Sequence, residues 1–416
     1  MAYRKGRKIR RRGHVVFSRS NRRRAILKNV LLTLLALALI PAGFFTAKFI
    51  LETADQNSKP ATSEASAAEP DTTSTIPTNP EPEKPKDTKK GFRAIYIPAS
   101  KLSNFESLES TLNSAASKGF NAVLFDLKGD DGVLHYQSQT PLAQQAKAAA
   151  GDALSLDQLK ALITKFKDKG FTPIPRVFAF RDPLSPHNLS TAKITLESHP
   201  GWTWLDNSKE KGGKPWLNPY SPDAHSYISG IVLELEQAGF SNIMLDGVQF
   251  PNQTSQAYYG NSELTNLSKL NVLKKFVSDL KSSLSENTKL ILAMPGLAAF
   301  GDGTEPFGGN PVTLGADIAA PVLMPSTLGN KLKAGDNTIV NPGLVPYDTV
   351  KLATSQVSLR LELMNENERP VLMPWLQGYD YTPAQVKEQI NAVAEALGQD
   401  SSFILYNSEG NYDFSF

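Results

Sequence analysis

Charged side chains near the ends of three apolar segments are the residues of this sequence best suited to chemistry. Asp126 and Lys128 lie in AVLFDLK, Arg176 lies in TPIPRVFAF, and Asp246 lies in NIMLDGVQF. A carboxylate in an apolar strand is costly to bury unless another group compensates its charge. Two carboxylates can flank and cleave a glycosidic bond while an arginine keeps one of them ionised, so we predict this chemistry.

The predicted site divides into catalytic and substrate-binding residues. Asp246 would be the nucleophile or the stabilising carboxylate, with Asp126 or Asp182 as its acid/base partner. Asp302 or Glu305, in the glycine-rich segment FGDGTEPFGGNP, are alternatives for that partner. The predicted substrate-binding side chains are aromatic, amide or cationic: Arg176, Lys128, Trp216, Tyr220, Gln249, Trp375 and Gln377.

The contacts within this cluster can also be predicted. Side chains alternate across a strand, so Asp126 and Lys128 should share one face. If that face points inward, Asp126, Arg176 and Asp246 meet on adjacent strands. We expect Asp246 to lie within salt-bridge reach of Arg176 or Lys128. A buried ion network that only stabilises the fold is the alternative to a catalytic site.

No metal or other cofactor is expected. The chain of 416 residues contains no cysteine, which excludes disulfides, thiolate zinc sites and cysteine nucleophiles. Its five histidines are scattered, and none forms an H-x-x-x-H or H-x-H pattern.

Eight short apolar segments alternate with helical patterns and must position these side chains. Three of the helical patterns end in a Gly-Phe step at residues 119–120, 170–171 and 239–240, where glycine is the expected left-handed cap. This alternation predicts a (β/α)8 TIM barrel in residues 91–416, with the eighth helix absent or replaced. A doubly wound open sheet is the alternative, but no glycine-rich phosphate loop follows the first segment. The predicted strands are residues 93–98, 122–128, 172–180, 242–250, 290–296, 318–325, 370–377 and 402–407.

Seven sequence blocks, in order, resemble a family of predicted glycoside hydrolase domains from bacterial secreted and membrane-anchored proteins. They include NAVLFDLKGDDGVLHY, PRVFAFRDP, PWLNPYSPDAHSY, GFSNIMLDGVQFP and MPWLQGYDY. The resemblance covers about residues 91–413 and implies a (β/α)8 barrel that acts on glycans. Several family positions differ here. Gly247 and Gln249 stand where the family has Tyr and Arg, and the fifth strand lacks its usual acid. Met324, Thr327, Leu328 and Gly378 replace further polar family residues.

The N-terminal quarter of the chain has a different composition. Residues 1–28 carry twelve Lys or Arg and no acid, which leaves 32 basic and 41 acidic residues elsewhere. Residues 1–24 are therefore predicted to be a cytoplasmic tail, and 25–51 a single membrane-spanning signal anchor of about 20 apolar residues. Residues 52–90, rich in Pro, Ser, Thr and Glu, are predicted to be a disordered linker. A cleaved signal peptide is the alternative to the anchor.

These features predict a membrane-anchored glycoside hydrolase whose barrel lies outside the cytoplasmic membrane. Its partner would be a polysaccharide or a cell-envelope glycan. The alternative is a non-catalytic barrel that binds glycan or forms part of the wall, because several polar family residues are missing. Nucleic acid is not an expected partner, since the basic segment would face the cytoplasmic leaflet and the outer domain is acidic.

Overall fold

The computed structural model describes residues 91–416, and the predicted tail, anchor and linker (1–24, 25–51 and 52–90) lie outside this range. None of the helices within 91–416 is both long enough and apolar enough to span a bilayer.

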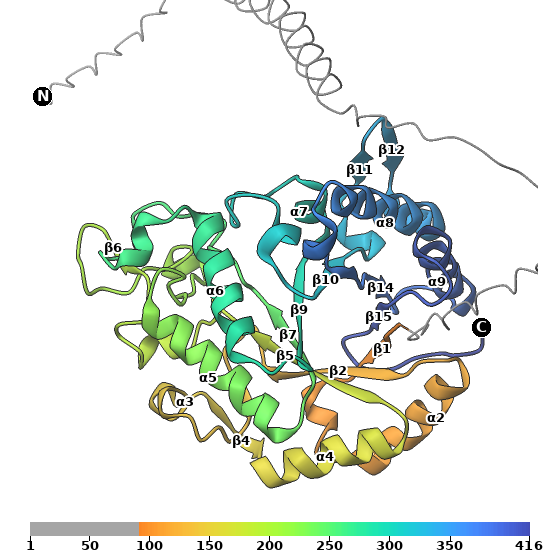
Figure 1. The fold of residues 1–416 in the computed structure, drawn as a ribbon, viewed down its shortest axis with the longest axis horizontal. Coiled ribbons are helices and arrows are strands. Elements are labelled where there is room, and N and C mark those ends of the chain that lie inside the picture. Colours follow the sequence, from red (N-terminus) through yellow and green to blue (C-terminus); the bar gives the residue numbers. More distant parts are fainter. Residues whose placement is uncertain (1–90) are drawn as a thin grey trace, which may run out of the picture. The chain divides into compact units, whose positions relative to one another are not determined.

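Eight strand positions form a closed parallel barrel (Figure 1). β1 pairs in parallel with both β2 and β15, so the sheet has no free edge between its first and last strands. β13 and β14 together occupy the seventh position, since both pair with β10. The predicted barrel is therefore confirmed, and the open sheet is wrong. The barrel strands are β1 (Arg93–Tyr96), β2 (Ala122–Lys128), β5 (Thr172–Phe178), β7 (Asn242–Asp246), β9 (Lys289–Pro295), β10 (Ile318–Val322), β13 (Val371–Leu372), β14 (Trp375–Gln377) and β15 (Phe403–Tyr406).

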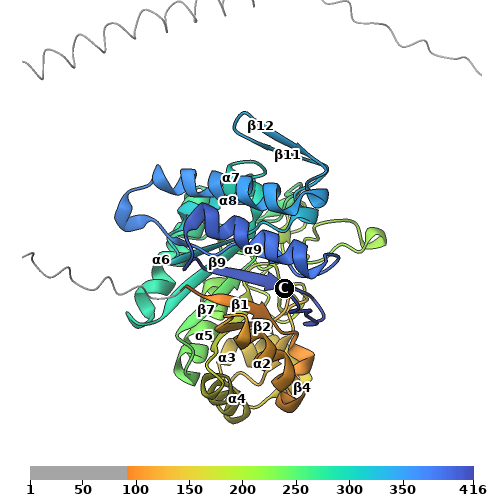
Figure 2. The same cartoon turned by 90° about the vertical axis from the view of Figure 1, so that its right-hand side faces the viewer.

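Helices cover the outside of this barrel (Figures 1 and 2), and α8 packs directly against α9. Gly119, Gly170 and Gly239 have φ angles of 81°, 80° and 111°, which confirms the predicted left-handed caps after three helices. The helices are α2 (Glu109–Ser117), α3 (Pro141–Ala146), α4 (Leu156–Asp168), α5 (Pro222–Ala238), α6 (Lys269–Ser283), α7 (Gly296–Phe300), α8 (Pro346–Glu362) and α9 (Pro383–Leu397).

The barrel strands are apolar on both faces and contribute side chains to two cores. The outer core lies between strands and helices, and includes Phe125, Val177 and Leu245. The inner core fills the barrel lumen, with Leu124, Ile174, Met244, Ile291, Ala320 and Ile404 among its members. This two-sided burial is what a helix-covered parallel sheet requires.

No helix follows β15 in the described chain; residues 407–416 run along the barrel as an extended tail. The Tyr412 hydroxyl lies 2.8 Å from the carbonyl oxygen of Tyr96 and 3.0 Å from that of Leu405. Phe414 packs edge-on against Phe120, with ring centroids 5.5 Å apart. In the described chain this tail covers the seam between β1 and β15.

Three excursions extend beyond the barrel. β3 (Leu134–Tyr136) and β4 (Ala149–Leu154) continue the sheet from β2. β6 (Thr195–Leu196) pairs with β8 (Ala257–Tyr258) in a separate small sheet. β11 (Lys331–Ala334) and β12 (Asn337–Val340) form a hairpin that projects from the domain (Figure 2).

Candidate active site

Three adjacent strands bring Asp126, Arg176 and Asp246 to the carboxyl-terminal mouth of the barrel. Each charged residue follows a lumen residue by two positions: Leu124, Ile174 and Met244, respectively. Strand register places Asp126 beside Arg176, and Phe178 beside Asp246. The alternation of side chains therefore points all three charged groups inward, as predicted from the sequence. Active sites of such barrels lie at this end of the strands.

A single guanidinium joins both carboxylates. Arg176 donates from Nε to Asp126 Oδ1 at 2.5 Å and from Nη2 to Asp126 Oδ2 at 3.0 Å. Its Nη1 donates to Asp246 Oδ2 at 3.3 Å. The side chain of Arg176 is 11% exposed, that of Asp126 is 15% exposed and that of Asp246 is 23% exposed. Asp246 is therefore the more accessible and the less tightly bound of the two carboxylates, and its predicted contact with Arg176 is confirmed.

Aromatic rings surround this guanidinium. The centre of the Arg176 guanidinium lies 4.9 Å from the Phe178 ring, 5.1 Å from Trp375 and 5.6 Å from Tyr96. The Tyr96 hydroxyl also donates to Asp126 Oδ2 at 2.9 Å. Tyr406 tilts against both Tyr96 and Trp375. The charged cluster thus lies in a partly buried cup of aromatic rings, where electrostatic interactions are stronger than in water.

The environment shifts the pKa values of this cluster in different directions. Burial disfavours the charge of Arg176, but Asp126 and Asp246 outweigh it and raise the Arg176 pKa, so the guanidinium stays charged. Burial, followed by the charge of Asp126, raises the pKa of Tyr96, which keeps that hydroxyl as a donor. Burial also raises the pKa of Asp246, although Arg176 and the N–H of Gly247 oppose this shift. Burial therefore favours the protonated form of Asp246.

The turn after Asp246 depends on glycine. The N–H of Gly247 donates to Asp246 Oδ1 at 2.7 Å, and Gly247 has a φ of 64°. A side chain here would be strained by that φ, and its Cβ would lie 3.0 Å from Cβ of Arg181. Gly247 therefore fixes the orientation of the Asp246 carboxyl group.

Comparison with known proteins assigns the domain. A family model described as "Putative glycosyl hydrolase domain" (DUF4015) matches residues 94–412. The chain belongs to this family. Among curated proteins, no sequence matches the chain.

Solved structures resemble the chain at low identity. A hypothetical protein from Ruminiclostridium thermocellum is 23% identical over 48% of this chain and 96% of its own, with a TM-score of 0.41. The Flavobacterium johnsoniae chitobiase is 11% identical over 77% of this chain and 45% of its own (TM-score 0.46). The Bacillus cereus spore cortex-lytic enzyme SleL is 13% identical over 71% and 52% (TM-score 0.35). This chain thus spans about half the length of the last two proteins.

Lys128 does not join the charged cluster, so the prediction that it shares a face with Asp126 is wrong. The β2–β5 register shifts between Asp126 and Lys128, so Lys128 pairs with Val177, whose side chain belongs to the outer core. Such a bulge reverses the face to which the following residue points. Lys128 instead binds Asp182 at 2.8 Å, and both side chains are fully buried.

The Asp182 side chain is fully buried and engaged within the protein. Its Oδ1 accepts the N–H groups of Leu184 and Ser185 at 2.9 and 2.8 Å, and its Oδ2 faces Lys128. This placement supports a structural ion pair that fixes the loop after β5, and it speaks against proton transfer by Asp182.

The remaining predicted binding residues separate into two places. Trp375 contacts Arg176 and lines the lumen, and its buried Nε1 has no hydrogen-bond partner within residues 91–416. Gln377 is buried. Its Oε1 accepts a hydrogen bond from the N–H of Ser326, and its Nε2 donates to the carbonyl oxygen of Tyr379. Gln249 is half-buried beyond the end of β7.

Trp216 and Tyr220 lie outside the mouth, in the excursion between β5 and α5. Trp216 packs in a small separate core and donates from Nε1 to Asp206 at 3.0 Å. The Tyr220 hydroxyl donates to the carbonyl of Leu267 at 3.0 Å. Neither residue contacts the charged cluster.

The opposite side of the mouth has no acid in its strands, and Gln377 is its buried polar side chain. Within their residue ranges in the structure, β9, β10, β13 and β14 contain no Asp or Glu. Met324 follows β10 and is buried in the lumen core. Asp302 and Glu305 are exposed on the loop after α7, which approaches the end of β7 through a hydrogen bond from Phe250 N to Pro306 O (2.9 Å). Neither acid contacts Arg176, Asp126 or Asp246 in the described structure.

Sequence reasoning missed Tyr96, Phe178 and Tyr406, which complete the aromatic cup. Tyr96 lies two residues after the lumen residue Ala94, so strand alternation could have identified it. Within the described residues, no group of three or more His, Asp or Glu could hold a metal ion.

Proposed function

We propose that the barrel is a glycoside hydrolase that cleaves a polysaccharide or a cell-envelope glycan at this mouth. The observation that carries the proposal is the bridge of one buried guanidinium between Asp126 and Asp246 at the catalytic end of a barrel in this family. Glycoside hydrolysis requires two carboxyl groups with different protonation states, and this arrangement supports such a difference.

The accessibility of Asp246 and its raised pKa favour a reversal of the roles suggested by the sequence. Asp246, with its raised pKa, is suited to give its proton to the glycosidic oxygen as the bond to the anomeric carbon breaks. Asp126 accepts three hydrogen bonds, from Arg176 and Tyr96, which hold it in a fixed position as the second carboxylate. Its negative charge would stabilise the oxocarbenium-like transition state. Water then adds to the anomeric carbon, and the proton that water releases restores the acid.

Hydrolysis assays with matched variants test these roles. Asp246→Asn and Asp126→Asn should each reduce, by orders of magnitude, the cleavage of a glycan that the wild type hydrolyses. Circular dichroism should show that both variants keep the fold. Asp130→Asn is the control, because Asp130 is an exposed carboxylate (54%) near the mouth, paired with Arg181. Wild-type activity should fall as pH rises through the pKa of Asp246, since the acid must be protonated. Unchanged cleavage by Asp246→Asn would refute the proposed role.

A glycan-binding barrel without hydrolysis is the second candidate. The apolar half of the mouth favours it, because β9, β10, β13 and β14 supply no further acid as the structure bounds them. This candidate predicts binding but no product from any glycan in a broad panel. Under it, Asp246→Asn would not alter any measured turnover.

We further propose that residues 25–51 anchor the barrel in the cytoplasmic membrane, with the N-terminus inside and the barrel outside. The basic segment before an apolar run of about 20 residues supports this orientation. Protease added to right-side-out vesicles should cut within residues 52–90 and release the barrel. Full protection of the barrel would contradict this topology.

A further inference from the structure

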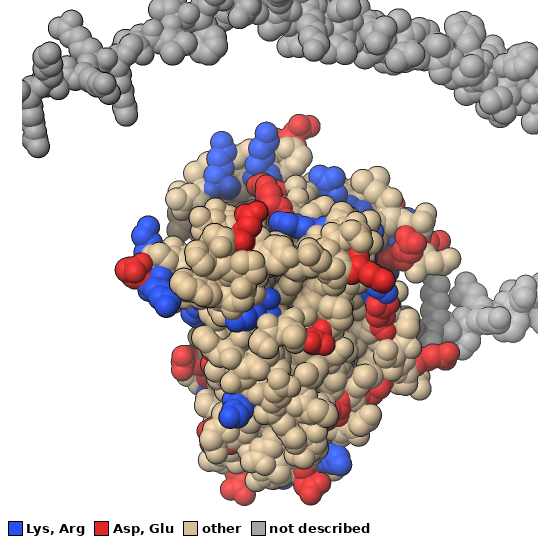
Figure 3. Space-filling view, turned by 90° about the vertical axis from the view of Figure 1, so that its left-hand side faces the viewer, with Lys and Arg blue, Asp and Glu red and all other residues tan. Residues whose placement is uncertain are grey.

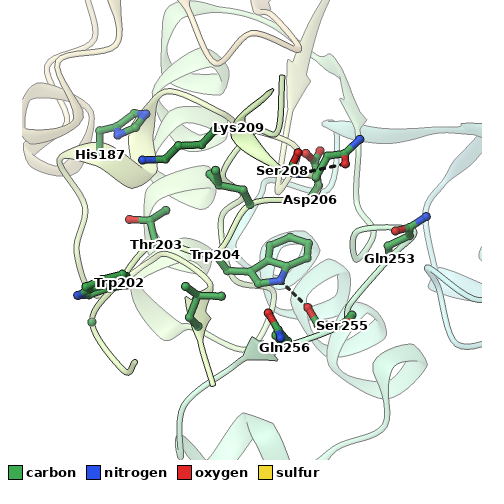
Figure 4. Close-up of a pocket in the computed structure, with 14 residues that line it drawn as sticks. His187, Trp202, Thr203, Trp204, Asp206, Ser208, Lys209, Gln253, Ser255 and Gln256 are labelled. Carbon is green, nitrogen blue, oxygen red and sulfur yellow. Dashed lines mark hydrogen bonds between the residues drawn. The ribbon is translucent and has the colours of Figure 1, made fainter. Parts of the chain in front are cut away.

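One cavity of the described domain is lined by residues outside the charged cluster at the mouth. It has a volume of about 910 Å³ and lies within the excursions after β5 and β7 (Figure 4). Ligand pockets commonly span about 300–1,000 Å³, so the size is suitable for a bound molecule. Its lining includes Trp202, Trp204, Asn207, Lys209, Gln253 and Gln256.

A dedicated framework holds this cavity. Ile194, Trp204 and Trp216 form a small core separate from both barrel cores. Trp204 donates from Nε1 to the carbonyl of Ser255 at 2.8 Å, and this bond links the two excursions (Figure 4). The β6–β8 pairing links them again. The walls are therefore tied together by specific bonds and are not independent loops.

Trp202 is the unusual member of the lining. Its side chain is 65% exposed, the largest aromatic side chain left open to solvent in the described domain. His199 stacks on the ring with centroids 4.7 Å apart and planes 24° apart. A bond from Leu196 N to Trp202 O (3.0 Å) attaches its backbone to β6. The indole is thus supported on one side, and much of its surface is available to a ligand.

The polar part of the lining is mostly uncharged. Asp206 uses its carboxylate internally, since it accepts from Trp216 Nε1 at 3.0 Å and from Lys214 N at 2.8 Å. The hydroxyl of Ser208 and the amides of Gln253 and Gln256 lie along the lining (Figure 4), and Asn207 lines the cavity as well. Gln256 has a φ of 60°, a strained backbone conformation that recurs at functional sites. Figure 3 shows the corresponding side of the domain, where acidic and basic side chains are scattered without a basic stripe.

We propose that this cavity is a binding site for a neutral polysaccharide, with Trp202 as its stacking platform. The C–H face of a sugar ring packs on an indole, while its hydroxyl groups bond to amides and hydroxyls along the wall. A nucleic acid could also stack on Trp202, but its phosphates require several cations, and Lys209 is the only Lys or Arg in the lining. The lining chemistry therefore favours glycan over nucleic acid.

The cavity and the active site lie at the same end of the barrel. The two walls of the cavity begin at the carboxyl ends of β5 and β7, the strands that carry Arg176 and Asp246. Gln253 follows Asp246 by seven residues, so a fully extended chain limits their separation to about 25 Å. One polymer could therefore occupy the cavity while another part of it lies at Asp246. This role as a remote subsite rests on the proposed hydrolase function, whereas polysaccharide binding itself does not.

Affinity measurements with soluble polysaccharides test the inference. Trp202→Ala in the full chain should weaken binding of a polysaccharide that the wild type binds by about tenfold or more, as expected when a central aromatic anchor is truncated. Trp202→Phe should retain most of the affinity because it keeps a ring. Leu363→Ala is the matched control, since Leu363 is an exposed apolar side chain (81%) outside the cavity, and it should bind like the wild type.

The possible results separate this inference from the proposed function. Loss of affinity in Trp202→Ala without any hydrolysis by the wild type would support the binding site and refute the hydrolase. Hydrolysis with unchanged polymer affinity and KM in Trp202→Ala would refute the binding site alone. Absence of both binding and cleavage across the panel would overturn both. Displacement of the polysaccharide by single-stranded DNA at Trp202 would also overturn the assignment to glycan.

Discussion

The two halves of the barrel mouth differ sharply in chemistry. The charged half, formed by β1, β2, β5 and β7, holds Tyr96, Asp126, Arg176 and Asp246 in one hydrogen-bonded cluster. The apolar half, formed by β9, β10, β13 and β14, presents Met324 and Trp375 to the lumen. The same strand geometry produces both halves, so the barrel itself does not determine where polar chemistry lies. Among the barrel strands that form these two halves, the acids at the mouth lie in the charged half.

The largest effect is expected from a substitution that disrupts the charged half. Arg176→Ala leaves two neighbouring carboxylates without their shared cation, and it should lower the free energy of unfolding by about 3–5 kcal/mol. Arg181→Ala is the matched control, because its pair with Asp130 is more than half exposed and should contribute at most about 1 kcal/mol. Urea unfolding of both variants provides the comparison. Equal losses would mean that the Arg176 cluster is no stronger than a surface pair.

The pH dependence of stability distinguishes Asp246 from ordinary carboxylates. Its pKa is raised in the folded state, so its contribution to stability is fully present below its usual pKa of about 4 and is lost as pH rises through the raised value. Most paired acids show the opposite trend. The difference in unfolding free energy between wild type and Asp246→Asn should therefore shift against the wild type as pH rises through this window. A difference independent of pH would contradict the raised pKa.

The contact between the two halves should have a smaller energy. The Trp375 ring from the apolar half faces the guanidinium of Arg176, at 5.1 Å. A double-mutant cycle with Arg176→Met and Trp375→Leu should give a coupling energy of roughly 0.5–2 kcal/mol for this cation–π contact. Thermal and chemical unfolding of the four proteins measure it. Strictly additive losses would show that the halves are energetically independent.

The smallest effect is expected within the apolar half. Met324→Leu conserves volume and removes no hydrogen bond made by the side chain, so it should cost less than about 1.5 kcal/mol. It should also leave the pH dependence of stability unchanged. A loss as large as that of Arg176→Ala would show that the apolar half is as specifically organised as the charged half.

The barrel and the core of the site follow from sequence patterns, but several site residues do not. The eight strands, the caps at Gly119, Gly170 and Gly239, and the meeting of Asp126 with Arg176 all depend on local periodicity, which the sequence displays. Lys128 could not be placed because a bulge shifts the register by an amount that alternation does not encode. The positions of Trp216 and Tyr220 depend on long excursions with their own core, and composition does not reveal that core.

The barrel closes where β1 pairs with β15, so it can be completed only after the C-terminal residues are available. The Tyr96 N–H binds the Tyr412 hydroxyl across 316 residues of sequence, and Phe92 N binds Ser402 Oγ across 310. Contacts of such separation form late and slow folding, because a long loop must close before they stabilise anything. During synthesis, β1 therefore emerges long before its neighbour β15 and must wait with one edge unpaired. An unpaired strand edge is prone to aggregation, so we expect loss of residues 408–416 to reduce the yield of folded protein.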